Sequence, residues 1–526
     1  MPTCSRCIAT SAECAYVESR RGYRGPKRKH VGQSPHGDAV TSASPNFTFN
    51  LLQTLQAPSP TSPLSFTDDT ISIDRDSNNE DDSADLFDLY YHFFHAAHPI
   101  VIPRRIFLQN YGVLPKHLRQ AMKVIGYQFL KMGQQSHLTQ AKEILCMPIP
   151  DDVFKVQSLL ILAIASFARF EREEGGDLLK RAVDVAQKIG LNSANFGERE
   201  QPLFRESYRR TWWELYTIVG IVSLIMPFGL KLDIAWSLPL PCHCEEYNNG
   251  QTSLTKTPQE MLDRFLAEGS FSWSSFAYKV EAVRILVNII DLSNDLFVSQ
   301  SQVDAAATSI ASFWMSLPVN KREVICRSGK TDEVLFCAHM LISLGSICLH
   351  LPRSGMPGIR HFKTICATNR AGIVAENAAS HKSAAIKAAS KLARLMSTGD
   401  ATKSHTPCFS CAIAFATAVQ LPAYLEEDEL SEMQLYKEQI QLAVSMLQEI
   451  SEIWPIASVV RTQIAQYARE VMGSSLPALN RSLRLESAPT VTDAILGNQE
   501  WLHNLLQGAD SGMEALIFQS ESELLT

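Results

Sequence analysis

The sequence lacks the features of a secreted or membrane-spanning protein. Its first residues are polar and basic, so no apolar signal core precedes the 12 cysteines. We therefore expect a reducing compartment and no disulfides. One stretch, Leu215 to Leu230, resembles a membrane span, but it has 16 residues and is interrupted by Pro227 and Gly229. Because a span needs about 20 residues, we predict a buried core helix there and no membrane partner.

Short catalytic motifs are lacking as well. The sequence contains no HExxH, GxSxG or GxGxxG motif. Gly329-Lys330-Thr331 resembles part of a phosphate loop, but Val324 stands where that loop needs glycine. We predict that the chain is not an enzyme. An all-α enzyme is kept as a third hypothesis, which requires a pocket with converging acids or bases.

An overall basic charge is also lacking. The net charge of -7 and the pI near 6.1 argue against a protein that coats nucleic acids. The charges are unevenly distributed, however. Residues 1–30 carry seven cations and two acids, residues 68–88 carry nine acids and one arginine, and residues 485–526 carry seven acids and no cation. A basic head and an acidic tail predict one end that binds a polyanion and one that binds a partner.

The composition divides the chain into four parts. Residues 31–67 contain 16 Ser, Thr or Pro in 37 positions, so we predict a disordered linker over 31–85, the last part of which is acidic. From Leu86 onward apolar residues recur at helical spacing, strand-like alternation is scarce and no fixed-period repeat occurs. We predict one large, irregular all-α domain over 86–475 and a weakly ordered tail over 476–526. Its expected helices begin near Leu86 and continue over 153–168, Leu178–Ile189 with a stop at Gly190, Tyr208–Met226, 260–268, 277–300, 303–315, 332–351, 367–396, 406–424, 430–453 and 455–473.

The sharpest local motif is formed by Cys4, Cys7 and Cys14. Three thiols at this x2 and x6 spacing are soft ligands that suit zinc. Tetrahedral zinc needs four ligands, and the segment supplies three; His30 is a distant fourth candidate. The alternative is that three cysteines near a terminus are incidental.

A basic run with interleaved tyrosines follows the cysteines. Its cations can neutralise DNA phosphates, and about six such contacts give log affinity a salt slope of roughly -5. Phosphate contacts supply affinity and register without reading the base sequence. The alternatives are a nuclear-import signal and a solvated tail. The predicted DNA-contacting residues are Arg6, Arg20, Arg21, Arg24, Lys27, Arg28 and Lys29.

Cys4, Cys7 and Cys14, followed by the run over residues 19–22, resemble the second half of the fungal six-cysteine binuclear zinc cluster of transcription factors. The resemblance implies that Cys4 bridges two zinc ions and that Cys7 and Cys14 are terminal ligands of one of them. The family's first three cysteines and its base-reading helix start have no counterpart before Met1. Two alternatives follow: the first half of the cluster lies upstream in the gene, or the chain is a shortened form.

A second resemblance covers more of the chain and is independent of the cysteines. Residues 86–94, the segment His98–Val101, residues 176–191 and the Trp-Trp stretch at 206–216 resemble the helical regulatory domain of these fungal transcription factors. The likeness extends over about residues 86–250 and more loosely to 473. It implies a nuclear regulator that binds double-stranded DNA, usually as a homodimer. The sequence offers too few leucines after the linker for a coiled coil.

The residues of the Trp-Trp stretch have an interpretation of their own. Trp212 and Trp213 are predicted to form a packing nucleus, because large aromatic side chains in a helix bury large areas. Arg209 and Arg210 either clamp a carboxylate across a helix interface or are ordinary surface charges.

Three further groups carry weaker signals. The triplet Cys242–Cys244 places its ligands too close together for one zinc ion. Cys408 and Cys411 have redox-motif spacing but open an apolar helix, so buried thiols are expected. A set of cations on one Ala-rich helix predicts a solvated face. These cations are Lys382, Lys387, Lys391 and Arg394.

The C-terminal tail mixes acids with large apolar residues such as Trp501, Leu505 and Phe518. Segments of this kind fold as short helices on transcriptional coactivators, so an activator is predicted. The alternative is an end without a partner.

Two functional hypotheses therefore stand beside the enzyme. The first is a nuclear, zinc-dependent transcription regulator; its modest length and short linker favour a pathway-specific one, by analogy with regulators of secondary-metabolite clusters. The second is a shortened regulator that does not bind DNA by itself and acts through protein or small-molecule contacts of its helical domain.

Overall fold

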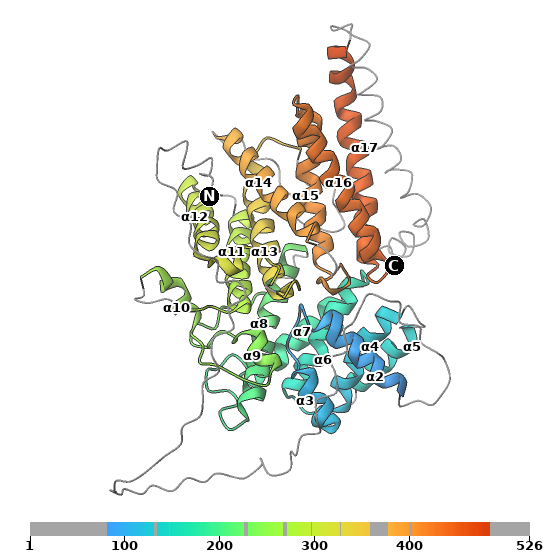
Figure 1. The fold of residues 1–526 in the computed structure, drawn as a ribbon, viewed down its shortest axis with the longest axis vertical. Helices are drawn as coiled ribbons and strands as arrows, with labels where there is room; N and C mark the ends of the chain where they lie inside the picture. The colour runs from blue at the N-terminus through green and yellow to red at the C-terminus, as the bar shows by residue number, and fades with distance from the viewer. Residues whose placement is uncertain are drawn as a thin grey trace, which may run out of the picture. The chain divides into compact units, whose positions relative to one another are not determined.

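The structure is a computed structural model that describes residues 81–130, 134–146, 148–225, 230–266, 271–295, 297–326, 328–357, 377–398 and 402–483. Within these ranges the chain is built from helices, and Ile325 and Thr331 form one isolated antiparallel bridge. The prediction of an all-α fold is confirmed (Figure 1). The α-helices are α2 Asp81–Leu89, α3 Arg104–Gln109, α4 Lys116–Leu130, α5 Gln134–Cys146, α6 Val153–Ala168, α7 Arg172–Lys188, α8 Pro202–Ile225, α9 Cys244–Asn248, α10 Pro258–Leu262, α11 Ser275–Asn294, α12 Gln300–Ser316, α13 Glu333–His350, α14 Ala378–Met396, α15 Phe409–Glu426, α16 Leu430–Ser451 and α17 Ile456–Leu483.

Short turns of other helix types connect these elements. The π-helical turn η1 (Tyr90–Phe94) continues α2, and 3-10 turns cover η2 Tyr111–Val113, η3 Asp263–Phe265, η4 Val319–Lys321, η5 Leu351–Arg353 and η7 Thr402–Ser404. The wider π turn places Tyr90, Tyr91 and Phe94 in the interior together. Such turns are frequent at functional positions in helices.

Local sequence signals account for several helix ends. The side chains of Asp152, Ser274 and Asp332 each accept a hydrogen bond from the backbone N–H three residues later, which caps α6, α11 and α13. Ser299 and Gln302 form a reciprocal capping box at the start of α12. Beyond α7, Gly190 has φ of +73°, so the predicted stop is confirmed.

Each predicted helix has an observed counterpart, and α6 has the predicted bounds. The helix predicted over 277–300 ends at Asn294, and α3, α4, α5 and α9 were not predicted. In α4 the buried face includes His117, Gly126 and Gln128 beside apolar residues at helical spacing. Gly126 is needed there, because a Cβ atom at this position would collide with the backbone of Leu86 in α2.

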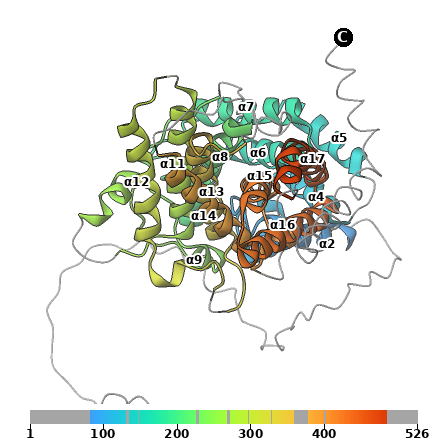
Figure 2. The same cartoon turned by 90° about the horizontal axis from the view of Figure 1, so that it is seen from above.

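The described helices share one core. Helix α6 packs against α4, α7 and α8, and α8 also packs against α11. Helix α13 lies among α11, α12, α14 and α15, and α15 packs against α16 and α17; Figure 2 shows these helices nearly end-on. Trp212 and Trp213 of α8 are both buried in this core, and the indole N–H of Trp213 donates to the Pro239 carbonyl at 2.9 Å. The predicted packing nucleus is confirmed.

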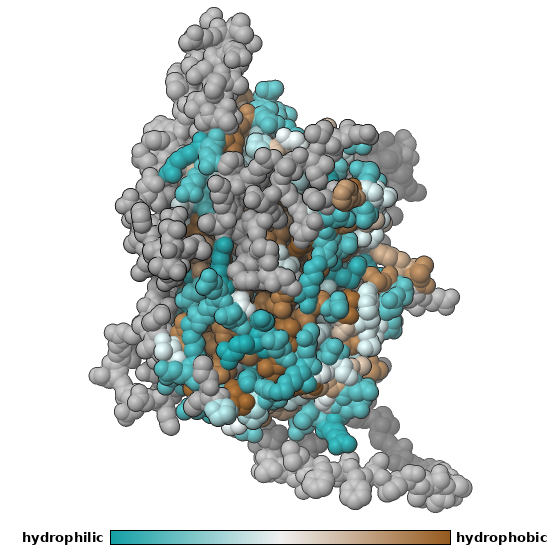
Figure 3. Space-filling view, turned by 180° about the vertical axis from the view of Figure 1, so that it is seen from behind, coloured by the Kyte–Doolittle hydropathy of each residue, from teal (hydrophilic) through white to brown (hydrophobic). Residues whose placement is uncertain are grey.

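Two helical segments are long and apolar enough to cross a membrane by length and composition, Glu333–Arg353 and Phe409–Glu426. In each, 89% of the apolar window is buried inside the protein, as expected of core helices in a large fold. On the face in Figure 3, polar side chains surround scattered apolar ones, a normal distribution for a protein surface.

Candidate functional site

The zinc and DNA sites predicted from the sequence lie outside the described residues. The structure describes neither the predicted zinc ligands nor the predicted phosphate contacts, and it does not describe the acidic-hydrophobic tail. Among the residues that the structure describes, no group of three or more His, Cys, Asp or Glu side chains could hold a metal ion. The residues outside the description are Cys4, Cys7, Cys14, Arg6, Arg20, Arg21, Arg24, Lys27, Arg28 and Lys29.

Within the described part, ionised side chains gather in the core along α8. Glu206, Arg210 and Glu214 follow one another at four-residue spacing, so they lie on one face of this helix. All three are at most 1% exposed. A buried charge is costly unless it is paired and hydrogen-bonded, so each needs partners that the fold must supply.

Glu206 is neutralised mainly by its own helix. One carboxylate oxygen accepts from Arg210 Nε at 3.0 Å, and the other accepts from Arg209 at 2.9 Å. Arg210 also donates to the carbonyl of Cys242 at 2.8 Å and stacks over the ring of Tyr247 at 4.1 Å. The two arginines thus clamp a carboxylate, but the expected clamp across a helix interface is wrong, because Glu206 lies on the same helix. The surface-charge alternative is wrong for Arg210, which is fully buried.

Glu214 is neutralised by distant parts of the chain. Its two oxygens accept from Lys279 Nζ of α11 at 2.9 and 2.8 Å, and one of them bonds His98 Nδ1 at 2.7 Å. Burial opposes the ionisation of Glu214, but Lys279 and His98 outweigh it and hold the pKa of the carboxyl below its ordinary value. Burial lowers the pKa of His98. Glu214 raises this pKa and Lys279 lowers it, and the net pKa lies below the ordinary value. His98 is therefore neutral at neutral pH, with Nδ1 as the donor.

These charged groups surround a buried irregular segment, residues 97–102. Its backbone carbonyls cannot reach water, so side chains bond them instead. Lys279 donates to Ala97, Gln157 and Ser207 donate to Ile100, and Tyr247 bonds Val101, at 2.6 to 3.1 Å. Four helices thereby fix the path of one irregular segment. This segment includes the His98–Val101 stretch on which the second resemblance partly depended.

His98 also joins this segment to the start of α15. Its Nε2 atom accepts from the hydroxyl of Thr406 at 3.2 Å. The neighbouring His405 bonds Glu333 at 2.9 Å and stacks on Phe336, with ring centroids 4.0 Å apart. Residues 402–408 are thus held at two adjacent positions by buried polar contacts.

The set Glu214, His98 and Thr406 has the order carboxylate, imidazole, hydroxyl that hydrolytic triads use. Two observations favour a structural role. Lys279 already neutralises Glu214, and Thr406 is only 3% exposed. The geometry holds two parts of the chain together without leaving the hydroxyl open to a substrate.

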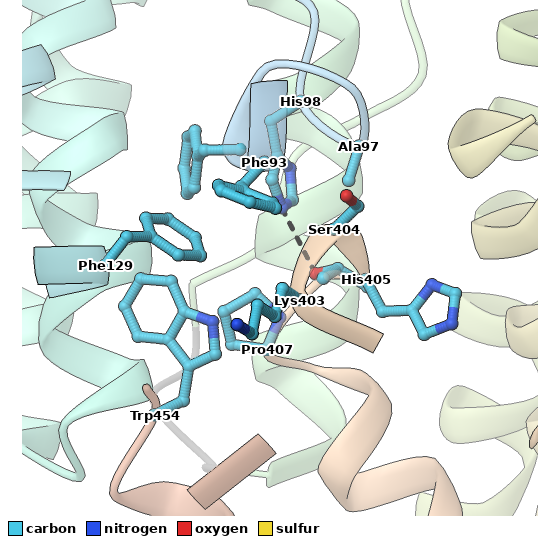
Figure 4. Close-up of a pocket in the computed structure, with 11 residues that line it drawn as sticks. Phe93, Ala97, His98, Phe129, Lys403, Ser404, His405, Pro407 and Trp454 are labelled. Atoms are coloured by element: carbon cyan, nitrogen blue, oxygen red, sulfur yellow. Dashed lines mark hydrogen bonds between the residues drawn. The ribbon is translucent and has the colours of Figure 1, made fainter. Parts of the chain in front are cut away.

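A shallow pocket lies directly outside this network (Figure 4). Stacked Phe93 and Phe129, with centroids 4.7 Å apart, form one wall, and Trp454 packs its ring edge-on against Phe129. His98 and residues 403–407 complete the lining. The enzyme hypothesis requires a pocket that contains polar groups, and this pocket has them. The space between its side chains, however, is too narrow for a water molecule.

The cysteines of the two weaker motifs, Cys242, Cys244, Cys408 and Cys411, are buried or half-buried thiols. Cys242 and Cys244 lie 3.8 and 3.5 Å from the guanidinium of Arg210, and burial raises the pKa of Cys242 to about 12. Burial also raises the pKa of Cys411 to about 12, and it raises the pKa of Cys408 above its ordinary value. These thiols stay protonated, so they are poor metal ligands and poor nucleophiles.

The sequence did contain one sign of the Glu214 network. Lys279 stands in α11 directly beside the apolar residues Phe276, Ala277, Tyr278 and Val280, and a lysine in such a position indicates a buried partner. That partner could not be identified, because Glu214 is 65 positions away and His98 and Thr406 lie still further apart.

Comparisons with known proteins agree with the second resemblance. Residues 87–301 match the family described as the fungal specific transcription factor domain. The chain is 26% identical over 536 aligned residues to the C6 finger domain transcription factor iacK of Pestalotiopsis fici, an alignment that covers 90% of this chain and 78% of that protein. No solved structure matches. The matched region contains η1, residues 97–102 and α8, and both findings support a transcription regulator.

Proposed function

We propose that this chain is a nuclear transcription regulator that binds DNA through zinc held by Cys4, Cys7 and Cys14 and through the basic run that follows. The described helices are its regulatory domain. The observation that carries the proposal is the likeness to a C6 finger domain transcription factor over 90% of the chain. The cysteine spacing and the +5 charge of residues 1–30 support it.

Further parts of the proposal depend on the family likeness. The regulator acts on a pathway-specific set of genes, of the kind found with secondary-metabolite clusters, and the acidic tail contacts coactivators. The protein binds as a homodimer, and no coiled coil contributes to the dimer.

A second candidate is a regulator that does not bind DNA by itself. It is favoured by the number of thiols at Cys4, Cys7 and Cys14, which is three, because a tetrahedral zinc site takes four ligands. Such a protein would act through contacts of its helical domain.

The salt dependence of DNA binding separates these candidates. For the full chain with zinc and a generic duplex, log affinity should fall with log salt at a slope of roughly -5, measured by fluorescence anisotropy. A fourfold Gln variant in the basic run should flatten the slope by about 3 to 4, since each lost phosphate contact removes about 0.9. The replaced residues are Arg20, Arg21, Lys27 and Arg28.

A matched control removes the same charge from exposed sites of the helical domain and should leave the slope unchanged. An equal flattening in both variants would contradict the phosphate contacts of the basic run. No binding by the unaltered chain at low salt would favour the second candidate. The control replaces Lys116, Lys180, Lys387 and Lys403 with glutamine.

A further inference from the structure

Charge changes sign abruptly where the helical domain begins. The acidic stretch over residues 68–88 carries nine acids and one arginine, and residues 89–142 then carry seven lysines and arginines and no acid. Two neighbouring segments of opposite charge attract one another, most strongly at low salt. In the part of the chain that the structure describes, most of these cations belong to α3 and α4.

Five cations of α3 and α4 form a surface that we call the basic face. Lys116, Arg119 and Lys123 stand at positions i, i+3 and i+7 of α4, so they lie on one side of that helix. Helix α3 adds Arg104 and Arg105 at its start, and both are exposed. Lys116 is exposed as well, and the other two cations of α4 are half-buried.

Helix α2, the last part of the acidic stretch, already contacts this face. The ring of Phe87 packs on Phe107 of α3 with centroids 4.9 Å apart, and the Nζ atom of Lys123 lies 5.6 Å from the centroid of the same ring. Asp88 accepts two hydrogen bonds from Arg104, each of 2.8 Å. Figure 1 shows α2, α3 and α4 near one another at the blue end of the described chain. The end of the acidic stretch is thus paired with the basic face.

The described acids leave this face positively charged. Asp85 and Asp88 of α2 oppose five cations, and among the described residues Arg105 and Lys116 make no ion pair. The nearby start of α6 does not supply the missing charge. Asp151 is held there by lysines of α6 and α7, and Asp152 caps its own helix.

We propose that the acidic segment formed by residues 68–82 docks on the basic face and continues the contact that α2 begins. This segment carries seven acids and one arginine. Residues 68–80, which precede α2, span up to about 45 Å when extended, whereas the 15 residues of α4 extend over only about 22 Å. Every cation of the basic face is therefore within reach.

The attachment to α2 favours this segment over the acidic tail. A segment fixed next to its binding site has an effective concentration in the millimolar range, so weak ion pairs suffice to hold it. Residues 485–526 are also acidic, but they follow α17, which does not adjoin α2, α3 or α4 in the chain. The acidic segment is thus the occupant that charge and chain connection favour together.

Docking has a consequence for the basic head at residues 1–30. The linker between head and acidic segment has 37 residues, so the segment can also pair with the head, whose net charge is +5. When the acidic segment lies on the basic face, the head keeps its cations for DNA phosphates. This consequence rests on the proposed function, but the docking itself does not.

The test uses the full chain without DNA and a carbodiimide, which joins a carboxylate to a lysine amine only at ion-pair distance. Peptide mass spectrometry should find acids of the segment joined to Lys116 and Lys123 at least about fivefold more often than to the exposed Lys180 and Lys387. In about 1 M salt the preference should disappear, because the Debye length falls to about 3 Å. Equal joining to all four lysines would overturn the proposal.

A pair of variants separates the basic face from lysine reactivity. Arg105→Glu combined with Lys116→Glu reverses two exposed charges of the face and should reduce the links to Lys123 several-fold. The matched control, Lys180→Glu combined with Lys387→Glu, reverses the same number of exposed charges elsewhere and should leave those links unchanged. Equal loss of links in both variants would contradict a specific contact.

Two further results identify a different occupant and would also overturn the proposal. The first is linking of the basic face to acids of residues 485–526 in place of the acidic segment. The second is linking between two copies, which a mixture of unlabelled and 15N-labelled chains reveals as peptides of mixed mass. Neither result bears on DNA binding, which the salt dependence described above tests separately.

Discussion

Two buried carboxylates on α8, Glu206 and Glu214, lie two helical turns apart and are stabilised in different ways. Glu206 has two arginine partners, both within four residues of it on the same helix. Glu214 has one cation, Lys279, which comes from α11, and one neutral imidazole, His98, which precedes α3. The first carboxylate is neutralised by secondary structure and the second by tertiary structure.

This difference implies different roles in stability. The ion pairs of Glu206 lie within α8, and Glu206 and Arg210 also bond the backbone of the loop at Cys242. The Glu214 cluster forms only when α8, α11, the segment 97–102 and the start of α15 have come together. The Glu214 cluster therefore makes the stability of the matched region 87–301 and that of the helices after it depend on one another.

The largest effect is expected when Glu214 loses its cation. Lys279→Met leaves a carboxylate buried without a formal counter-charge and removes the donor to the Ala97 carbonyl. Loss of one partner of a buried pair costs about 3–5 kcal/mol of unfolding free energy, measurable by urea denaturation. Adding Glu214→Gln to Lys279→Met should restore part of that loss. A change below about 1 kcal/mol for the single variant would show that the pair contributes little.

A smaller effect is expected at the other carboxylate. Arg210→Met leaves Glu206 paired with Arg209 at 2.9 Å but removes the bond to the Cys242 carbonyl and the stacking on Tyr247. We expect a loss of about 2 kcal/mol in the same denaturation experiment. If this variant were less stable than Lys279→Met, the distinction between local and tertiary neutralisation would be wrong.

The same distinction explains what could be predicted from the sequence. The all-α class, the helix over 153–168, the stop at Gly190 and the burial of Trp212 and Trp213 follow from spacing and local signals. The Glu206–Arg210 pair has four-residue spacing on one helix and was within reach of the sequence, although a carboxylate on another helix was expected. The Glu214 network could not, because its members are separated by 65 to more than 300 positions.

One of the helices that were missed, α4, does not have this cause. Helix α4 buries His117 and Gln128 together with apolar residues, but its apolar residues still recur at helical spacing, so this helix could have been predicted from the sequence. Gln128 donates to the carbonyl of Ile453 far along the chain, a partner that spacing does not reveal. Lys391, which is half-buried over the Trp314 ring, was assigned to a solvated face for a similar reason, because Trp314 comes from another helix. The zinc and DNA contacts predicted at the N-terminus stay predictions.

The smallest expected effect is a pH dependence of the unfolding free energy, to which the Glu214 cluster contributes through His98 and the Glu206 cluster does not. The pKa of His98 in the folded protein lies below its ordinary value of 6.5, because burial disfavours the imidazolium. As the pH falls below about 6.5, the unfolded chain takes up a proton that the folded chain does not, so stability falls, by at most about 1.4 kcal/mol per pH unit for this histidine. His98→Asn keeps a donor for Glu214 but cannot titrate, so unfolding free energies measured between pH 6.5 and 5 should fall less steeply. Arg210→Met should keep the slope of the unaltered chain, because the bonds around Glu206 involve no histidine. Equal slopes in the His98→Asn variant and the unaltered chain would mean that His98 is protonated in the fold, and that Glu214 has two cations as Glu206 does.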